Sequence, residues 1–316
     1  MTFRHYKPAG TTNTYCKKKG YVTGPPGFKY AARRAAAALY PALFFLSAPA
    51  MNAQTSQPGC EQIFNMMINA IDQVKTLRFN LHSEERFATG FVVVNSMIKV
   101  NTAPYKVYYK DLARGVEALW LQGQNDNEAI INPNGFPYVN LRLDPYGKIM
   151  HKDAHQTIDR LGYSYIRKIL YHSVNQFPDA YKKYIIRGED TDYDGNSCYK
   201  LVMNFTDFHY LTVMVQNKGE SVNSIADSFY LNNYLVLTAN GLTSYEEELK
   251  PGTILSVPDV YAKTSVIVIR KDLNLPVYLR IYDNKGLFEV YGFTNIQVNT
   301  PMPDAEFTED YPGYNF

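Results

Sequence analysis

Two histidines four residues apart form the first pattern in this sequence that could bind a metal. In the segment HKDAH, His151 and His155 are followed by Asp159, so a helix would bring all three side chains to one face. A zinc peptidase also needs a glutamate beside the first histidine, and that position is Lys152. Histidines on the surface or at a helix start explain the spacing without a metal. We therefore predict no metal site here.

A second pattern resembles the start of a calcium-binding loop. DTDYDG spans Asp190 to Gly195, but the twelfth position of such a loop is Leu201 where a glutamate is required. Asp194-Gly195 is instead typical of the turn in a two-residue β-hairpin. The runs Glu84–Arg86 and Glu246–Glu248 are typical of solvated charges. We find no phosphate-binding glycine loop, nucleophile elbow or Ser/His/Asp arrangement, so we predict no catalytic residue and no cofactor.

The charges of the 316-residue chain are unevenly distributed. Residues 1–53 contain eight basic and no acidic side chains, which leaves 24 basic against 30 acidic side chains, a net charge of −6, for the remainder. Binding to nucleic acid phosphates requires clustered cations. We therefore expect no nucleic acid partner.

The basic segment precedes a short apolar run. Arg33-Arg34 is followed by AAAALYPALFFLSAPA, which is too short to span a bilayer comfortably and ends in small residues. We interpret 1–53 as a secretory leader; a buried helix or a membrane anchor is the alternative. Neither the twin-arginine pair nor Cys60 has the neighbours expected of a twin-arginine signal or a lipid anchor. We expect an exported protein of the periplasm or cell envelope.

Export determines how the cysteines are interpreted. Cys16 lies in the leader, and the remainder keeps Cys60 and Cys198. In an oxidising compartment this pair can form a disulfide, which would stabilise the fold by about 4 to 5 kcal/mol through loop closure. Two separately buried thiols are the alternative.

The elements between these residues point to an α+β fold. Residues 60–76 have apolar side chains at helical spacing, and the segments up to about residue 132 alternate like the strands of an antiparallel meander. Helical spacing returns from Ile158 to Leu170, a hairpin is expected around Asp194-Gly195, and strands resume from about residue 264.

A helical unit interrupts these two runs of strands. A short strand is expected to end at Asn217, and Glu220 or Ser221 can cap a first helix. Asn232 or Asn233 can cap a second helix, and TILSVP supplies a closing strand. The expected inward residues are Val222, Ile225, Ala226, Phe229, Leu235, Val236 and Ala239. We predict a βααβ insertion at 210–259.

The insertion resembles the LysM domain in the order and spacing of its anchor residues. These are Gly219-Glu220-Ser221-Val222, Ile225-Ala226, Phe229, Leu231, Asn240-Gly241-Leu242, Pro251-Gly252 and Leu255-Ser256-Val257-Pro258. The one departure is the stretch TSYEEE after Leu242, which is about two residues longer than the family pattern.

The LysM resemblance implies binding of N-acetylglucosamine-containing glycans, above all peptidoglycan. The sugar would lie between two loops, held by backbone groups. The implied glycan-binding residues are Lys218, Gly219, Glu220, Ser221 and Val222 in the first loop and Leu242, Thr243 and Ser244 in the second. A glycine and a helix start are suited to this because both expose backbone to a ligand.

The segments around the insertion resemble the LolA-like fold of bacterial envelope proteins. The similarity rests on YKVYYKD, GVEALWLQGQNDNEAIINPNGF, LRLDPYGKIMHKDAHQTIDRLG and LPVYLRIYDNKGLFEVYGFTNIQVN. It implies a curved antiparallel sheet, or half-barrel, around an apolar cavity closed by helices, in some members a carrier of lipids or lipoproteins.

The sequence thus predicts a leader at 1–53, a LolA-like host domain at 54–209 and 260–316, and a LysM-like module at 210–259. We expect a non-enzymatic envelope protein that binds peptidoglycan. The alternatives are a periplasmic carrier of lipid or lipoprotein, and a cell-wall hydrolase accessory protein.

Overall fold

The computed structural model describes residues 57–177 and 179–316, so the predicted leader lies outside the described residues. The described residues form one compact unit. None of the helices in the described ranges combines the length and apolar character needed to cross a membrane. The predicted first helix is α1 (Cys60–Asp72).

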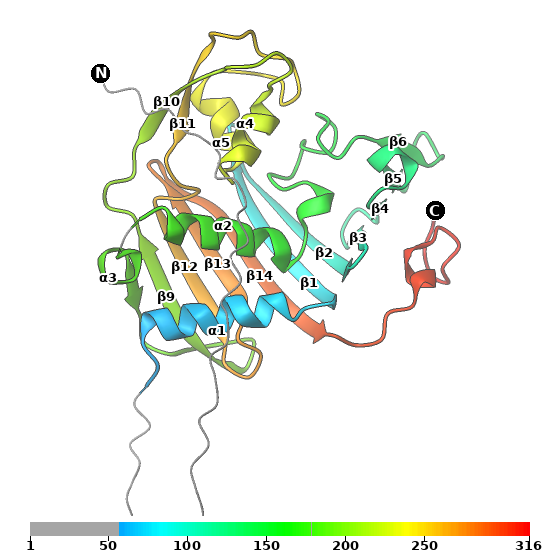
Figure 1. The fold of residues 1–316 in the computed structure, drawn as a ribbon. Helices are drawn as coiled ribbons and strands as arrows, with labels where there is room; N and C mark the ends of the chain where they lie inside the picture. Colours follow the sequence, from blue (N-terminus) through cyan, green and yellow to red (C-terminus); the bar gives the residue numbers. More distant parts are fainter. Residues whose placement is uncertain (1–56, 178) are drawn as a thin grey trace, which may run out of the picture. The chain divides into compact units, whose positions relative to one another are not determined.

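A large antiparallel sheet forms the centre of this unit (Figure 1). The first strands are β1 (Thr76–Phe87), β2 (Gly90–Thr102), β3 (Tyr105–Asp111), β4 (Glu117–Leu121), β5 (Ala129–Asn132) and β6 (Leu141–Leu143). The later strands are β7 (Ile185–Arg187), β8 (Thr191–Tyr193), β9 (Asn196–Asn204), β12 (Thr264–Arg270), β13 (Leu275–Asp283) and β14 (Gly286–Val298). The predicted meander and α+β class are confirmed.

The strand order joins the two ends of the chain. It runs β6-β5-β4-β3-β2-β1-β14-β13-β12-β9-β7, with β8 pairing β9, so the first and last long strands lie side by side. The hairpin expected at Asp194-Gly195 is present: Tyr193 pairs with Asn196, and the two turn residues have φ of 49° and 73°. Asp-Gly suits this turn because both positions need positive φ.

Two helices cover one face of the sheet. Figure 1 shows α1 and α2 (Tyr163–Asn175) lying across the same face, where they enclose the main apolar core. Helical spacing from Ile158 predicts an earlier start for α2. This predicted start is wrong. Gly162 adopts φ 97°, which lies outside the helical range, and Ile158–Arg160 forms only a 3-10 turn. A short helix, α3 (Ala180–Lys183), follows.

The two cysteines lie on opposite faces of the sheet and are free thiols. Cys60 packs against the core under the helices, as do Leu201 and Met203 of β9. Side chains alternate along a strand, so Cys198 points to the other face, where it packs with Val268 and Val277. The possible Cys60–Cys198 disulfide is therefore not formed in this structure, where the two thiols lie apart.

The segment between β9 and β12 leaves the sheet and returns to it at a paired position, since Asn204 faces Thr264. It contains β10 (Tyr210–Met214), α4 (Val222–Ser228), α5 (Asn233–Ala239) and β11 (Ile254–Pro258), and β10 pairs with β11. Strand, helix, helix and strand thus follow one another in the expected order.

Side-chain hydrogen bonds from neighbouring residues determine where these short helices begin. Ser221 caps α4 in a capping box with Ser224, and Asn232 caps α5 by accepting the Leu235 N–H at 3.1 Å. β10 ends earlier than expected because the Glu220 carboxylate accepts the N–H groups of Gln216 and Asn217, at 2.8 and 3.2 Å.

Five of the seven expected inward residues of the insertion pack in its own small core, whereas Leu235 packs in the main core and Ala239 in neither. Val222 and Val236 are fully buried. Ala239 is exposed at the last position of α5, so its predicted inward orientation was wrong.

Candidate ligand cavity and adjoining buried network

A cavity of about 520 Å³ lies between the sheet and α2. Its walls come from β1 to β6, from β12 to β14, from the segment 149–162 and from α2. The apolar lining includes Phe79, Leu81, Val94, Val116, Ala118, Ile131, Leu141, Leu143, Met150, Ile158, Leu161, Ile166, Ile169, Leu170, Ile267, Leu279, Ile281 and Phe293. Cavities of this size and character bind small apolar molecules.

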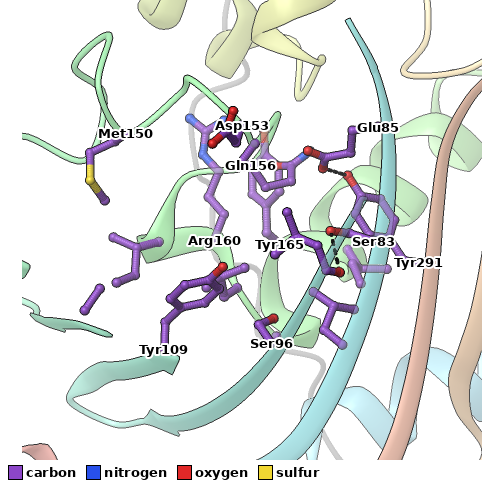
Figure 2. Close-up of a pocket in the computed structure, with 18 of the residues that line it drawn as sticks. Ser83, Glu85, Ser96, Tyr109, Met150, Asp153, Gln156, Arg160, Tyr165 and Tyr291 are labelled. Atoms are coloured by element: carbon purple, nitrogen blue, oxygen red, sulfur yellow. Dashed lines mark hydrogen bonds between the residues drawn. The ribbon is translucent and has the colours of Figure 1, made fainter. Parts of the chain in front are cut away.

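Polar side chains interrupt this apolar lining. They are Ser83, Glu85, Ser96, Tyr109, Arg114, Lys152, Asp153, Gln156, Arg160, Tyr165, Tyr261, Ser265 and Tyr291. Figure 2 shows the hydrogen bond from Tyr291 to Glu85, with Gln156 and Arg160 nearby. An apolar chamber with some polar groups in its wall suits an amphiphile.

A buried network of two carboxylates and one imidazole reaches the cavity through Glu85. Glu85 of β1, His155 of the 149–162 segment and Glu289 of β14 are at most 4 % exposed. His155 Nδ1 lies 2.8 Å from Glu289 Oε1, and the His155 backbone N–H donates to Glu85 Oε2 at 2.7 Å. The network thus ties three distant parts of the chain together.

Neutral donors complete the network. Asn232 Nδ2 donates to Glu289 Oε1 at 2.7 Å, and the Tyr261 hydroxyl donates to Glu289 Oε2 at 2.9 Å. Tyr291 donates to Glu85. Since Asn232 is the cap of α5, the insertion is hydrogen-bonded directly to the sheet that forms the cavity wall.

Burial and neighbouring charges shift the protonation equilibria of this network. Burial disfavours the charged imidazole, but the Glu85 and Glu289 carboxylates outweigh this and raise the pKa of His155. Burial also raises the pKa of Glu85, against the opposing effect of His155. Protons are therefore retained here to higher pH than on free side chains.

Glu85, His155 and Glu289 could each offer one ligand atom to a metal, because these atoms lie within 4.8 Å of one another. All four carboxylate oxygens, however, accept hydrogen bonds from His155, Asn232, Tyr261 or Tyr291. The carboxylates are therefore satisfied without an ion, and the donor arrangement fits a hydrogen-bonded charge network better than a metal centre.

The expectation of surface or helix-start histidines was wrong. His151 and His155 are 3 % and 1 % exposed and lie in a non-helical segment. His151 stacks on Tyr245 at 4.2 Å, and burial lowers its pKa to about 4. Asp159 does not join them but accepts the Tyr146 hydroxyl at 2.7 Å.

The prediction that residues 84–86 are solvated charges is wrong for Glu85, which is buried. The alternation of β1 could have identified it, because Glu85 has the same parity as the inward-facing Phe79 and Leu81. Glu289 likewise shares the parity of Tyr291 and Phe293 on β14. The signal missed was an acid at an inward position of a strand.

Arg160 forms a second buried link to the insertion. Its side chain is 6 % exposed and pairs with Asp227 of α4, and it donates to Asn233 at 3.2 Å. The guanidinium also lies over the rings of Tyr146 and Tyr165, at 5.4 and 4.6 Å from their centroids. Arg160 lines the cavity as well, so this contact joins the cavity wall to α4.

The first loop predicted to bind glycan packs against its own chain. The Gly219 N–H donates to Glu248 at 3.1 Å, and the Leu249 N–H donates to the Glu220 carbonyl at 2.7 Å. Ser221 is the α4 cap and Val222 is fully buried, so the Val222 side chain cannot cover a sugar. Lys218 is exposed.

The second predicted loop lies on the surface. Leu242 packs against the small core of the insertion, Thr243 is exposed, and the Ser244 hydroxyl accepts the Glu247 N–H at 3.1 Å. The residues that follow contact the first loop through Glu248, which accepts the Gly219 N–H, and the Tyr245 carbonyl accepts the Asn223 N–H of α4 at 3.0 Å. The longer TSYEEE stretch therefore fills space beside the first loop.

No family description matches this chain, and no curated protein matches it. Among solved structures it is similar to a DUF1329 family protein from Desulfovibrio piger, with 10% identity, 79% of this chain and 97% of that chain covered, and a TM-score of 0.32. It is similar to the lipoprotein LppX from Mycobacterium tuberculosis, with 11% identity, 76% and 95% coverage, and a TM-score of 0.38.

A third similar structure is a putative outer membrane lipoprotein-sorting protein domain from Vibrio parahaemolyticus, with 10% identity, 79% and 96% coverage, and a TM-score of 0.28. Similarities at this level assign no function. The function of this chain must be derived from its own cavity.

Proposed function

We propose that this protein binds an apolar chain, that of a lipid or of a lipid-modified polypeptide, and carries it in the cell envelope without chemical change. The observation that supports this is the cavity of about 520 Å³ between the sheet and α2, which has mainly apolar walls interrupted by polar side chains. Each methylene transferred from water into such a site contributes about 0.8 kcal/mol. A chain of about ten methylenes would gain about 8 kcal/mol before the costs of binding are subtracted.

The test is a comparison of two alanine variants. Ala118 lines the cavity, so Ala118→Phe places a ring inside it, whereas Ala239→Phe adds the same bulk to an exposed helix position. We expect organic extraction and mass spectrometry to recover lipid from the unmodified protein and from Ala239→Phe. Ala118→Phe should bind a fluorescent fatty acid at least tenfold more weakly. Equal binding by all three proteins, or no recovered lipid and no probe binding, would contradict the proposal.

A second candidate function is glycan binding by the insertion. It is supported by the exposure of Lys218 and of Gly219, whose φ is 85° and whose Cα has open space around it, with nothing within 4 Å of the position that a Cβ would take. Its N–H is occupied by Glu248, so a sugar would have to displace that carboxylate. Sedimentation with purified peptidoglycan tests this: Glu248→Ala should increase the bound fraction, and no sedimentation of either protein would remove glycan binding from consideration.

A further inference from the structure

Residues 133–152, the mouth segment, form both a wall of the cavity and an exposed apolar surface. Pro133, Leu141, Leu143, Ile149 and Met150 line the cavity. Ile149 is nevertheless 68 % exposed, so the lining reaches the molecular surface at this residue. The cavity entrance therefore lies along this segment.

Among the large apolar side chains of the described residues, the three with the highest exposed fractions lie in the mouth segment: Phe136, Tyr138 and Ile149. Phe136 is 86 % and Tyr138 81 % exposed, and Val139 is 58 % exposed. The Phe136 and Tyr138 rings lie edge to face with centroids 6.3 Å apart. Single apolar side chains on a surface are ordinary, but two highly exposed aromatic rings in contact with each other are a feature that suits an interaction site.

The local backbone holds these rings outward. The Tyr138 N–H donates to the Gly135 carbonyl at 2.6 Å, and Asn134 Nδ2 donates to the Arg114 carbonyl at 2.9 Å. Tyr138 adopts φ 60°, a conformation that a bulky residue rarely adopts and that glycine or asparagine would favour. The backbone therefore gives no reason for an aromatic residue at this position, whereas a surface contact does.

The charge of the mouth segment is opposite to that of the remainder of the protein. It contains three basic residues, Arg142, Lys148 and Lys152, and one acid, Asp144, which gives a net charge of +2, whereas the other residues of 54–316 together carry −8. All three cations are exposed, and within 57–177 and 179–316 no ion pair involves them. Exposed aromatic rings and these exposed cations within one segment fit the interface of an anionic bilayer.

We propose that the mouth segment docks on a phospholipid bilayer containing anionic lipid, so that the cavity entrance faces the membrane from which an apolar chain is taken or to which it is delivered. This inference rests on the proposed function for its purpose, but the docking itself depends only on the surface. Phe136, Tyr138 and Val139 would enter the interfacial layer, while Arg142 and Lys148 would lie at the phosphates.

The experiment measures binding of the purified full chain to vesicles of phosphatidylcholine and of a phosphatidylcholine–phosphatidylglycerol mixture. We expect binding to the mixed vesicles, and at least a tenfold loss in the double variant Phe136→Ser/Tyr138→Ser. The matched control is Ile186→Ser/Ile254→Ser, which removes side chains that are 59 % and 63 % exposed elsewhere. The control should bind as the unmodified protein does.

Two further measurements keep the outcome unambiguous. Arg142→Gln/Lys148→Gln should weaken binding to the mixed vesicles but not to the phosphatidylcholine vesicles. In Phe136→Trp, the tryptophan fluorescence should shift to shorter wavelength when vesicles are added. The buried Trp120, 8 % exposed, contributes a constant background to this fluorescence. Equal vesicle binding by the Phe136→Ser/Tyr138→Ser variant and its control, or binding only to a protein partner, would overturn the proposal.

The failure of docking can be distinguished from failure of the proposed function. Phe136→Ser/Tyr138→Ser should still bind a soluble fluorescent fatty acid as the unmodified protein does, because Phe136 and Tyr138 do not line the cavity. Loss of fatty acid binding in every variant would instead contradict the carrier function.

Discussion

At the scale of single residues, His155 connects more of the structure than any sequence pattern indicated. Its side chain contacts Glu289, and its ring stacks on Tyr234 of the insertion and on Phe288 of β14, with centroids 4.7 Å apart in both cases. Its backbone N–H binds Glu85. A single side chain thus joins cavity wall, sheet and insertion.

The raised pKa of His155 predicts a pH-dependent stability. A group whose pKa is raised in the folded state contributes fully below its unfolded value, about 6.5 for histidine, and its contribution is lost as pH rises through the folded value. Glu85, whose pKa is also raised, contributes in the same direction. We therefore expect the melting temperature to fall as pH rises above about 6.5.

Variants separate this effect from general titration. His155→Gln should reduce the pH slope and cost about 3 kcal/mol at acidic pH, because a buried carboxylate loses its charged partner. His209→Gln, which removes an imidazole that is 61% exposed, is the control for loss of a surface histidine. Melting curves across the pH range decide this, and an identical slope in both variants would show that His155 is not responsible.

At the scale of elements, the insertion is attached to the sheet by buried polar contacts as well as by its two strand connections. Asn232 reaches Glu289 and Tyr261, and Asp227 reaches Arg160. These contacts link α4 and α5 to the cavity wall. Movement of the insertion would therefore displace Arg160 and Tyr261, which line the cavity.

The two helix caps of the insertion give a matched comparison. Ser221→Ala removes an exposed cap and should cost about 1 kcal/mol. Asn232→Ala removes a cap and also the buried donor to Glu289, so it should cost at least about 2 to 4 kcal/mol. Chemical denaturation measures both values; equal costs would mean that the bond to Glu289 contributes nothing.

The ion pair between Arg160 and Asp227 should respond unequally to loss of either partner. The Arg160 side chain is 6 % exposed and the Asp227 side chain 40 %. Asp227→Ala leaves a buried cation without its carboxylate and should cost about 3 kcal/mol or more, whereas Arg160→Met leaves an acid that water can reach and should cost less. Free energies of unfolding of the two variants test this order, and the reverse order would contradict it.

At the scale of the whole molecule, the cavity is bordered both by the buried network, through Glu85, and by the mouth segment. The two faces of the sheet are used differently. One carries α1, α2 and the cavity, and the other is covered near β3 and β4 by the chain end, where Phe307 and Tyr314 pack around Tyr108 and Leu119.

Ligand occupancy should therefore change global stability. A ligand that binds only the folded state stabilises it by about 2.7 kcal/mol at a hundred times its dissociation constant. Lipid-stripped protein should melt at a lower temperature than protein reloaded with lipid, and Ala118→Phe should show no such difference. Calorimetry of the stripped and reloaded samples measures this, and an unchanged melting temperature on reloading would argue against a cavity ligand.

The sequence by itself determined the features that depend on neighbours a few residues away. Asp194-Gly195 specifies a tight turn, Ser221 and Asn232 cap helices, and alternating apolar residues form strands, because each of these needs only its local chain. The antiparallel meander and the strand, helix, helix, strand order of the insertion were accessible in this way.

Only the tertiary structure decided which distant residues meet. Cys60 and Cys198 are separated because strand parity places Cys198 on the far face of the sheet, and Glu85, His155 and Glu289 converge because β1 pairs with β14. Such meetings depend on register and strand order over the whole chain, which no local pattern encodes. The cavity arises for the same reason, since its walls belong to segments that only the complete sheet brings together.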